Sequence, residues 1–365
     1  MSTALDLGDG RTVTDGQIAA INLESTRRRA WACFTQDSGA PRVAESLVDL
    51  ERMVAQFLGD LTALDRLEML ARQFAHADES FRAPLLEAEV ASSAHRFRDA
   101  RTHLSAAARL GAPCIDIERR LLAVNQACGL QLDDVLDGRC RFAAESGKIE
   151  ELVPLGALFA DLERFAEADA VYRKAFSSYD GTSPFPLAWV CFQLGMLWGE
   201  LVPEPDLRLA ERWYQRAIAY LPGYVRARVH LAEIYASEDQ LSDAEALLLS
   251  ALSSCDPEVR WRLAGVRIAQ GRFEEAEIQR KAARSGFESL LAKHRLAFAD
   301  HAAEFYADDG NDPELALELA RTNAANRPTR RAITQMDRIA KGLDRTRRSD
   351  RYESAKELAA QPNPM

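Results

Sequence analysis

Histidine is the side chain best suited to metal binding and proton transfer near neutral pH, and this chain has six. His95 and His103 are eight residues apart, and His294 and His301 are seven apart, so each pair can share one face of a helix. Zinc ligands on a single helix usually come three or four residues apart, with a third ligand nearby. We therefore expect these histidines to make surface or interhelical hydrogen bonds rather than to bind a metal.

The remaining motifs of catalysis and cofactor binding are also missing from the sequence. Gly147-Lys148 lacks the upstream glycine and the following Ser or Thr of a phosphate loop. Neither a Gly-x-Ser-x-Gly elbow nor a His-Glu-x-x-His zinc motif occurs. The run from Asp308 to Asp312 resembles part of a calcium loop, but without its terminal Glu it is predicted to be a turn. We predict no catalytic, cofactor-binding or metal-binding residues, and a protein that is not an enzyme.

Charge and hydropathy exclude further classes of partner. The formal net charge of −10 makes nucleic acid a poor partner. Apolar runs fall well short of the ~18 residues that cross a bilayer, so no membrane span is expected. Residues 1–11 are polar and acidic and lack a signal-peptide pattern, which predicts a cytoplasmic protein. The six cysteines are scattered, several of them on helical stripes, and are interpreted as buried free thiols rather than as a disulfide framework.

The elements that would position any site are helices, and their pattern is strongest between Trp189 and Pro222. Two sets of residues each share a helix face, at spacings of three, four or seven: Leu194, Gly195 and Trp198 in a first helix, and Ala210, Tyr214 and Ala217 in a second. The small residues lie where two antiparallel helices must approach closely. The large ones fill the space around that contact, and Pro222 ends the second helix. The stretch therefore predicts a helical hairpin.

The same pattern recurs along the chain, with copies 32 to 39 residues apart, against roughly 34 in tetratricopeptide repeats. The seven other copies begin at Leu155-Gly156, Leu231-Ala232, Leu263-Ala264 and Ala302-Ala303, and more weakly at Leu50, Ala88 and Leu122-Ala123. The pattern resembles the tetratricopeptide repeat family, and the Asp206–Ala217 grouping is also similar to Sel1-like repeats. The resemblance implies an all-α, right-handed α-solenoid of about eight hairpins with terminal capping helices. No strand is expected.

This interpretation divides the chain into three segments. Residues 1–42 form a lead-in and a first helix, from about Asp15 to Phe34, whose basic run at Arg27–Arg29 is expected to face solvent. Residues 43–328 form the repeat array, which is one elongated body rather than several globular domains. Residues 329–365 form a capping helix and a charged tail, frayed from Asp344 onward.

In the tetratricopeptide family the first helices of successive hairpins line a concave groove that holds a peptide or a partner protein. The resemblance places eight partner-binding candidates there: Trp189, Phe192, Met196, Arg226, Val229, Glu233, Trp261 and Ile268. A chaperone-type carboxylate clamp is excluded because its positions hold Val153, Phe192, Val229 and Trp261. The groove is predicted to be apolar in its middle and acidic toward Asp300, Glu304 and Asp308. The alternative, that Trp189, Phe192 and Trp261 pack between hairpins, is left open.

By resemblance, the predicted function is protein–protein interaction, as a scaffold or adaptor that binds a partner protein or peptide in its groove. Two alternatives remain: a regulator that senses a small peptide, and a non-catalytic subunit that presents substrate to an enzyme. A second copy of the chain is a further possible partner, since exposed groove aromatics would need to be covered. Neither nucleic acid nor a membrane is an expected partner.

Overall fold

The computed structural model describes residues 12–360, with side chains described as far as Arg345. Within this range the chain forms seventeen α-helices and no strand, which confirms the predicted all-α class. None of these helices combines the length and the apolar character needed to cross a bilayer. Most of the predicted lead-in, residues 1–13, and the side chains of the basic tail beyond Arg345 lie outside the described residues.

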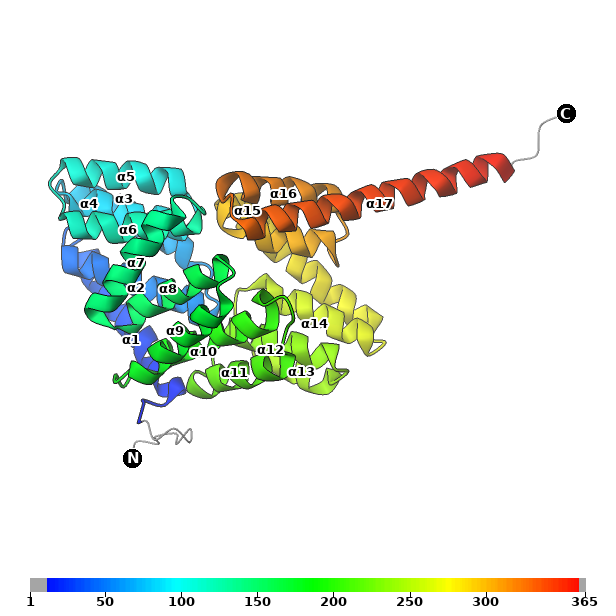
Figure 1. The fold of residues 1–365 in the computed structure, drawn as a ribbon, viewed down its shortest axis with the longest axis horizontal. Helices are drawn as coiled ribbons and strands as arrows, with labels where there is room; N and C mark the ends of the chain where they lie inside the picture. The colour runs from blue at the N-terminus through cyan, green and yellow to red at the C-terminus, as the bar shows by residue number, and fades with distance from the viewer. Residues whose placement is uncertain (1–11, 361–365) are drawn as a thin grey trace.

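The helices form eight antiparallel hairpins, in agreement with the eight sequence copies (Figure 1). The first four are α2 (Pro41–Leu58) with α3 (Ala63–Ala77), α4 (Arg82–Ser93) with α5 (Phe97–Arg109), α6 (Cys114–Ala127) with α7 (Leu132–Ser146), and α8 (Ile149–Asp161) with α9 (Phe165–Ser178). The next two are α10 (Pro184–Met196) with α11 (Leu207–Tyr220) and α12 (Val225–Ser237) with α13 (Leu241–Leu249). The last two share α15 (Phe273–Ala307), which pairs with α14 (Pro257–Ala269) and then with α16 (Pro313–Asn326). Before and after them lie α1 (Gly16–Gln36) and α17 (Arg330–Ala360).

Glycine at a fixed position allows the two helices of a hairpin to come together. A Cβ built on Gly195 of α10 would lie 2.6 Å from Cδ1 of Tyr214 in α11. One hairpin earlier, a Cβ on Gly156 of α8 would lie 2.6 Å from Cε1 of Tyr172 in α9. Both tyrosines are 1 % exposed, so neither ring has room to move. The predicted register of Leu-Gly against a buried tyrosine is therefore correct in both hairpins.

Helix α15 departs from the repeat plan because it joins hairpins seven and eight without a loop. It is 35 residues long, and its only non-helical position is His294, with φ −133° and ψ 49°. The part before this break, residues 273–293, is about two turns longer than the 14 residues of α9 or α11. This extra length carries hairpin eight back toward the N-terminal hairpins (Figure 1).

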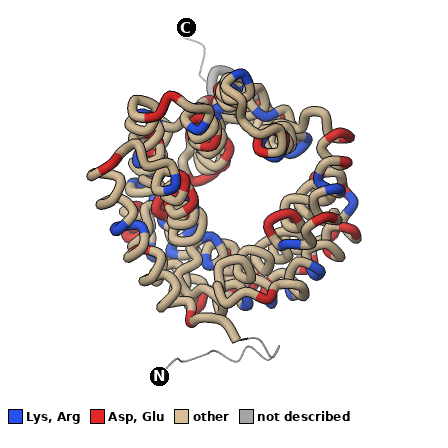
Figure 2. The backbone as a smooth tube through the Cα atoms, turned by 90° about the vertical axis from the view of Figure 1, so that its left-hand side faces the viewer, with Lys and Arg blue, Asp and Glu red and all other residues tan. Residues whose placement is uncertain are grey.

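As a result the array closes into a ring rather than forming the elongated body predicted from sequence (Figure 2). Asp65 of α3 accepts a hydrogen bond from Lys293 Nζ at 2.6 Å and pairs with His294 Nε2 at 2.8 Å. Asn326 Nδ2 donates to the carbonyl of His95 at 2.9 Å. We call this contact the closure seam; its residues are Asp65, His95 and Ala127 on the N-terminal side and Lys293, His294, Asn326 and Arg327 on the C-terminal side.

The first helix packs across the start of the array through a buried carboxylate. Glu51 of α2 is fully buried and accepts from Trp31 Nε1 at 2.6 Å, Arg27 Nη1 at 3.1 Å and Arg66 Nε at 2.8 Å. Such a charge is tolerated in the interior only because it is paired and hydrogen-bonded. The prediction that the Arg27–Arg29 run faces solvent is therefore wrong for Arg27, which neutralises Glu51.

The last helix both caps the array and extends beyond it. Ile339 and Leu343 of α17 are buried against hairpin eight, in a cluster that includes Tyr306 and Leu319. This is the expected role of a terminal helix, which covers the open end of a repeat array. The backbone then stays helical to Ala360, although the charged sequence predicted fraying from Asp344.

Candidate functional site

The ring surrounds a cavity of about 1250 Å³. Small-molecule sites usually measure ~300–1,000 Å³, so this cavity is large enough for a segment of polypeptide. Its wall comes from hairpins one and two, hairpins five to eight and the start of α17. The lining is rich in charge: six arginines (52, 226, 262, 327, 331 and 338), three histidines (95, 230 and 301) and seven carboxylates (200, 233, 256, 258, 300, 304 and 308).

Four of the eight residues predicted to bind a partner line this cavity. They are Met196 of α10, Arg226 and Glu233 of α12, and Trp261 of α14. The acids predicted at one end of the groove, Asp300, Glu304 and Asp308, also lie in its wall. The structure thus gathers residues from three consecutive hairpins on one surface, as the register required.

The other four candidates lie elsewhere. Phe192 is 4 % exposed and packs against Tyr214 and Tyr224, and Val229 is 2 % exposed in the core of hairpins six and seven. Trp189 is half-buried against the central core, and Ile268 is exposed outside the cavity wall. The cavity wall is therefore mixed, with charged groups beside apolar residues such as Leu67, Ile234 and Phe298, rather than apolar through the middle.

Trp261 is a core residue with one face turned to the cavity. It is 3 % exposed, and its ring makes edge contacts with Phe287 and Phe305, whose centroids are 6.4 and 5.7 Å away. The guanidinium of Arg262 lies 3.6 Å from the ring centroid. Phe192 and Trp261 therefore pack between hairpins, which is the alternative that the sequence left open.

A π-helical turn brings one carboxylate into the cavity wall. The segment η1, Leu197–Leu201, continues α10 with wider turns, and Gly199 and Glu200 line the cavity. Trp198, on the same turn, donates its indole N–H to Asp169 at 2.8 Å. π-helical turns are rare and often occur at functional sites. Here the turn places Glu200 next to α12.

Glu200 and Glu233 meet at His230. The Nδ1 of His230 lies 2.7 Å from Glu200 Oε1 and 3.4 Å from Glu233 Oε2. The imidazole stacks on Tyr214 at 5.6 Å between centroids, with an interplanar angle of 18°. Burial lowers the pKa of His230, but the two carboxylates outweigh it and the net shift is upward. Burial raises the pKa of Glu200, but the charge and hydrogen bonding of His230, together with the charge of Arg331, outweigh it and the net shift is downward.

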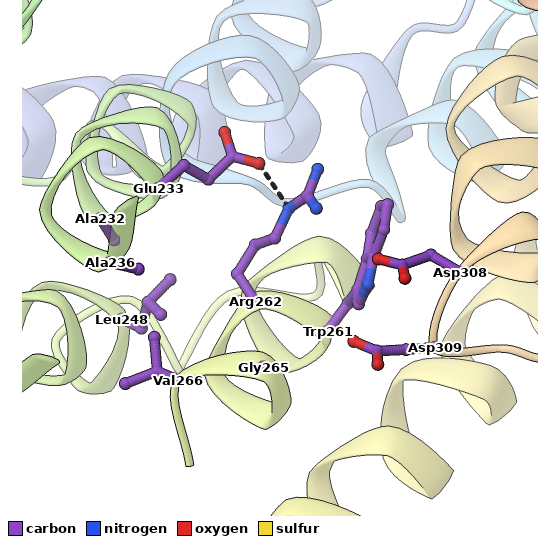
Figure 3. A pocket seen from close by; sticks show the side chains of 10 residues that line it. All are labelled: Ala232, Glu233, Ala236, Leu248, Trp261, Arg262, Gly265, Val266, Asp308 and Asp309. Atoms are coloured by element: carbon purple, nitrogen blue, oxygen red, sulfur yellow. Dashed lines mark ion pairs between the residues drawn. The ribbon is translucent and has the colours of Figure 1, made fainter. Parts of the chain in front are cut away.

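Arg262 links this cluster to a second histidine. Its Nε lies 2.7 Å from Glu233 Oε1, as the dashed line in Figure 3 marks, and its Nη2 lies 3.3 Å from Glu258 Oε1. The other oxygen of Glu258 lies 3.3 Å from His301 Nδ1. The nearby charge of Asp300, together with the hydrogen bond to Glu258, raises the pKa of His301 to about 9. Beside Arg262, a small pocket of about 200 Å³ extends toward Asp308 and Asp309 (Figure 3).

The six arginines of the cavity wall fall into two groups, three that pair with a carboxylate of the wall and three that do not. Arg262, Arg327 and Arg338 each form an ion pair with a carboxylate of the same wall. In the part of the chain with described side chains, no carboxylate lies within ion-pair distance of the remaining three, Arg52, Arg226 and Arg331. Arg226 lies over the ring of Phe192 at 5.5 Å, while Arg52 and Arg331 are exposed.

The His230 cluster was not predicted from the sequence, although half of its signal was present. His230 and Glu233 are three residues apart, the spacing that places two ligands on one helix face. The pair is missed when only the spacing between histidines is considered, because the second ligand is a glutamate. Glu200 carries no such signal, because it reaches His230 only through the π-helical turn and the packing of α10 on α12.

Comparison with known proteins gives structural similarity only. No family model and no curated protein matches the sequence. The structure is similar to "a tetratricopeptide repeat protein" from Parabacteroides merdae, at 14% identity and a TM-score of 0.41, covering 72% of this chain and 99% of that one. It is also similar to MamA, at 20% identity and a TM-score of 0.38, covering 46% of this chain and 95% of that one. For the APC/C hetero-tetramer Cut9-Hcn1 the identity is 12% and the TM-score 0.44, covering 87% of this chain and 55% of that one.

Proposed function

We propose that this protein is a protein-interaction scaffold that binds an acidic segment of a partner protein in its central cavity. The all-helical repeat fold supports a binding role in general, and the cavity is larger than a small molecule needs. The wall offers charged groups from separate hairpins rather than a single catalytic constellation. An extended segment that crosses the cavity would contact several hairpins at once.

The observation that carries this proposal is the set of three arginines, Arg52, Arg226 and Arg331, that form no close ion pair with a carboxylate among the described side chains. A guanidinium binds a carboxylate through two parallel hydrogen bonds, and such charge-assisted bonds are about twice as strong as neutral ones. The other three arginines of the wall are already neutralised within the protein. An Asp or Glu side chain of a partner protein would supply the carboxylate that Arg52, Arg226 and Arg331 lack.

The overall negative charge of the protein does not oppose this choice. At physiological ionic strength, charges more than about 8 Å apart are largely screened, so the outer surface acts only weakly on a segment inside the ring. Met196 adds an unbranched apolar side chain to the wall, which adapts to partner side chains of different shape. The segment that fits therefore carries acidic residues where it meets Arg52, Arg226 and Arg331, with apolar residues between them.

A displayed library of random peptides tests the proposal and needs no candidate partner. Selection on the wild-type protein should enrich peptides rich in Asp and Glu. Binding of those peptides should fall about tenfold or more for Arg226→Glu and for Arg52→Glu, because each reversal also repels the bound carboxylate. Arg212→Glu is the matched control, since Arg212 is exposed on α11 and does not line the cavity.

Two outcomes would contradict the proposal. One is a selected set without acidic enrichment. The other is binding that survives both cavity substitutions but is lost with Arg212→Glu, which would place the peptide on the outer surface of the ring.

A further inference from the structure

We propose that Glu200, His230 and Glu233 form a binding site for a divalent zinc-class metal ion in the cavity wall. This site shares the cavity wall with the three arginines, and the charge of Arg331 acts on Glu200, but the metal-site proposal does not depend on peptide binding. One ligand atom from each of the three residues lies within 4.8 Å of the other two. The residues come from two helical elements, η1 and α12, which are fixed in the core on either side.

The distances suit a metal ion in place of a proton. Around a tetrahedral zinc with bonds of about 2.0–2.1 Å, neighbouring ligand atoms lie about 3.3 Å apart. His230 Nδ1 is now 2.7 Å from Glu200 Oε1 and 3.4 Å from Glu233 Oε2. A neutral imidazole with Nδ1 unprotonated, and an outward shift of the Glu200 carboxylate by a few tenths of an ångström, would admit the ion. Side-chain rotation of Glu200, which is 41 % exposed, is enough for that shift.

Surrounding side chains hold two of the three ligands in position. His230 is held between the ring of Tyr214, stacked at 5.6 Å, and that of Phe192, edge-on at 5.4 Å. The other oxygen of Glu233, Oε1, lies 2.7 Å from Arg262 Nε, which leaves Oε2 directed at the imidazole. Partners of this kind orient metal ligands and raise affinity in known sites. Arg262 thus limits Glu233 to one metal bond but does not block the site.

The ligand set identifies the class of ion. An imidazole nitrogen suits zinc and its neighbours in the first transition series, whereas Mg²⁺ and Ca²⁺ prefer oxygen ligands alone. Two carboxylates balance the charge of a divalent ion. Three protein ligands on a cavity wall leave the fourth position to water or to a ligand atom from the cavity. The site is therefore of the open kind, in contact with whatever enters the ring.

The test uses the full-length protein after treatment with a chelator. Calorimetric titration with Zn²⁺ should give one ion per chain and release of protons, because the imidazole must be neutral to bind. Co²⁺ should give the visible absorption of a four-coordinate site. The melting temperature should rise with Zn²⁺ in the wild-type protein. His230→Gln and Glu200→Gln should each weaken Zn²⁺ binding about tenfold or more.

His103→Gln provides the matched control. His103 Nδ1 lies 3.2 Å from Glu87 Oε2, so this pair resembles the site but lacks a third ligand. Binding that is unchanged in His230→Gln, or that is lost in His103→Gln, would overturn the proposal. So would the absence of stoichiometric Zn²⁺ binding in the wild-type protein, or a preference for Mg²⁺. Glu200→Gln changes a half-exposed side chain, so it tests the site even if His230→Gln fails to fold.

Discussion

Replacing Gly195 by alanine tests the helix contact on which the whole repeat register rests. The new Cβ would lie 2.6 Å from Cδ1 of Tyr214, whereas carbon atoms in contact normally stay about 3.5–4.0 Å apart. The tyrosine cannot retreat, because it is 1 % exposed and its ring packs against Phe192 and His230. Overpacking of this kind costs ~1–3 kcal/mol. Alanine returns ~0.8–1.0 kcal/mol of helix propensity, so we expect a net destabilisation of up to ~2 kcal/mol.

Gly265→Ala is the control, since it makes the same chemical change in a helix where space is free. The nearest heavy atom to a Cβ at Gly265 is Asp309 Oδ2, at 4.0 Å. Only the propensity gain remains there, so the substitution should stabilise α14 by up to ~1 kcal/mol. The two changes should therefore have opposite signs.

Hydrogen exchange is the appropriate assay, because a repeat array opens locally and a single melting temperature averages over its parts. Slowly exchanging amides of α10 and α11 should lose protection by up to roughly thirtyfold in Gly195→Ala, since 1.4 kcal/mol is a factor of ten. Amides of α14 should gain up to about fivefold in Gly265→Ala. Equal effects in both variants, or a loss spread evenly over all hairpins, would refute the proposed contact and its local energetics.

Two further predictions concern pH and ring closure. Because the pKa of His301 is raised from 6.5 to about 9, the folded state binds its proton more tightly, so this stabilisation is complete below pH 6.5 and is lost as pH rises to about 9. In denaturant titrations, the free energy of unfolding of His301→Gln should fall less than that of the wild-type protein between pH 6.5 and about 9. An equal fall in both proteins would show that other groups cause it. In the closure seam, Asp65→Ala leaves the imidazole of His294 without its partner at 2.8 Å, whereas Lys293→Ala removes only an exposed ion pair of small energy. X-ray scattering should therefore show an increased radius of gyration for Asp65→Ala alone, and equal radii for both variants would contradict the role of Asp65.

Local patterns in the sequence were enough to determine the hairpins. The spacing of Leu194, Gly195 and Tyr214 encodes a contact between two neighbouring helices, and such contacts depend on residues within one repeat of each other. The same pattern located all eight hairpins and the capping helix after Pro328. It also placed Met196, Arg226, Glu233 and Trp261 on one surface, because the inward face of a helix follows from its periodicity.

Ring closure and the charged cavity were decided only by the tertiary structure. The seam joins Asp65 to His294 across more than 200 residues, and no local pattern encodes such a pair. Small rotations between successive hairpins add up along the array, so whether its ends meet depends on exact helix lengths, above all that of α15. The same holds for Glu200, which a π-helical turn directs toward His230. Aromatic residues that look like groove anchors in sequence, such as Phe192, became core residues because neighbouring hairpins cover them.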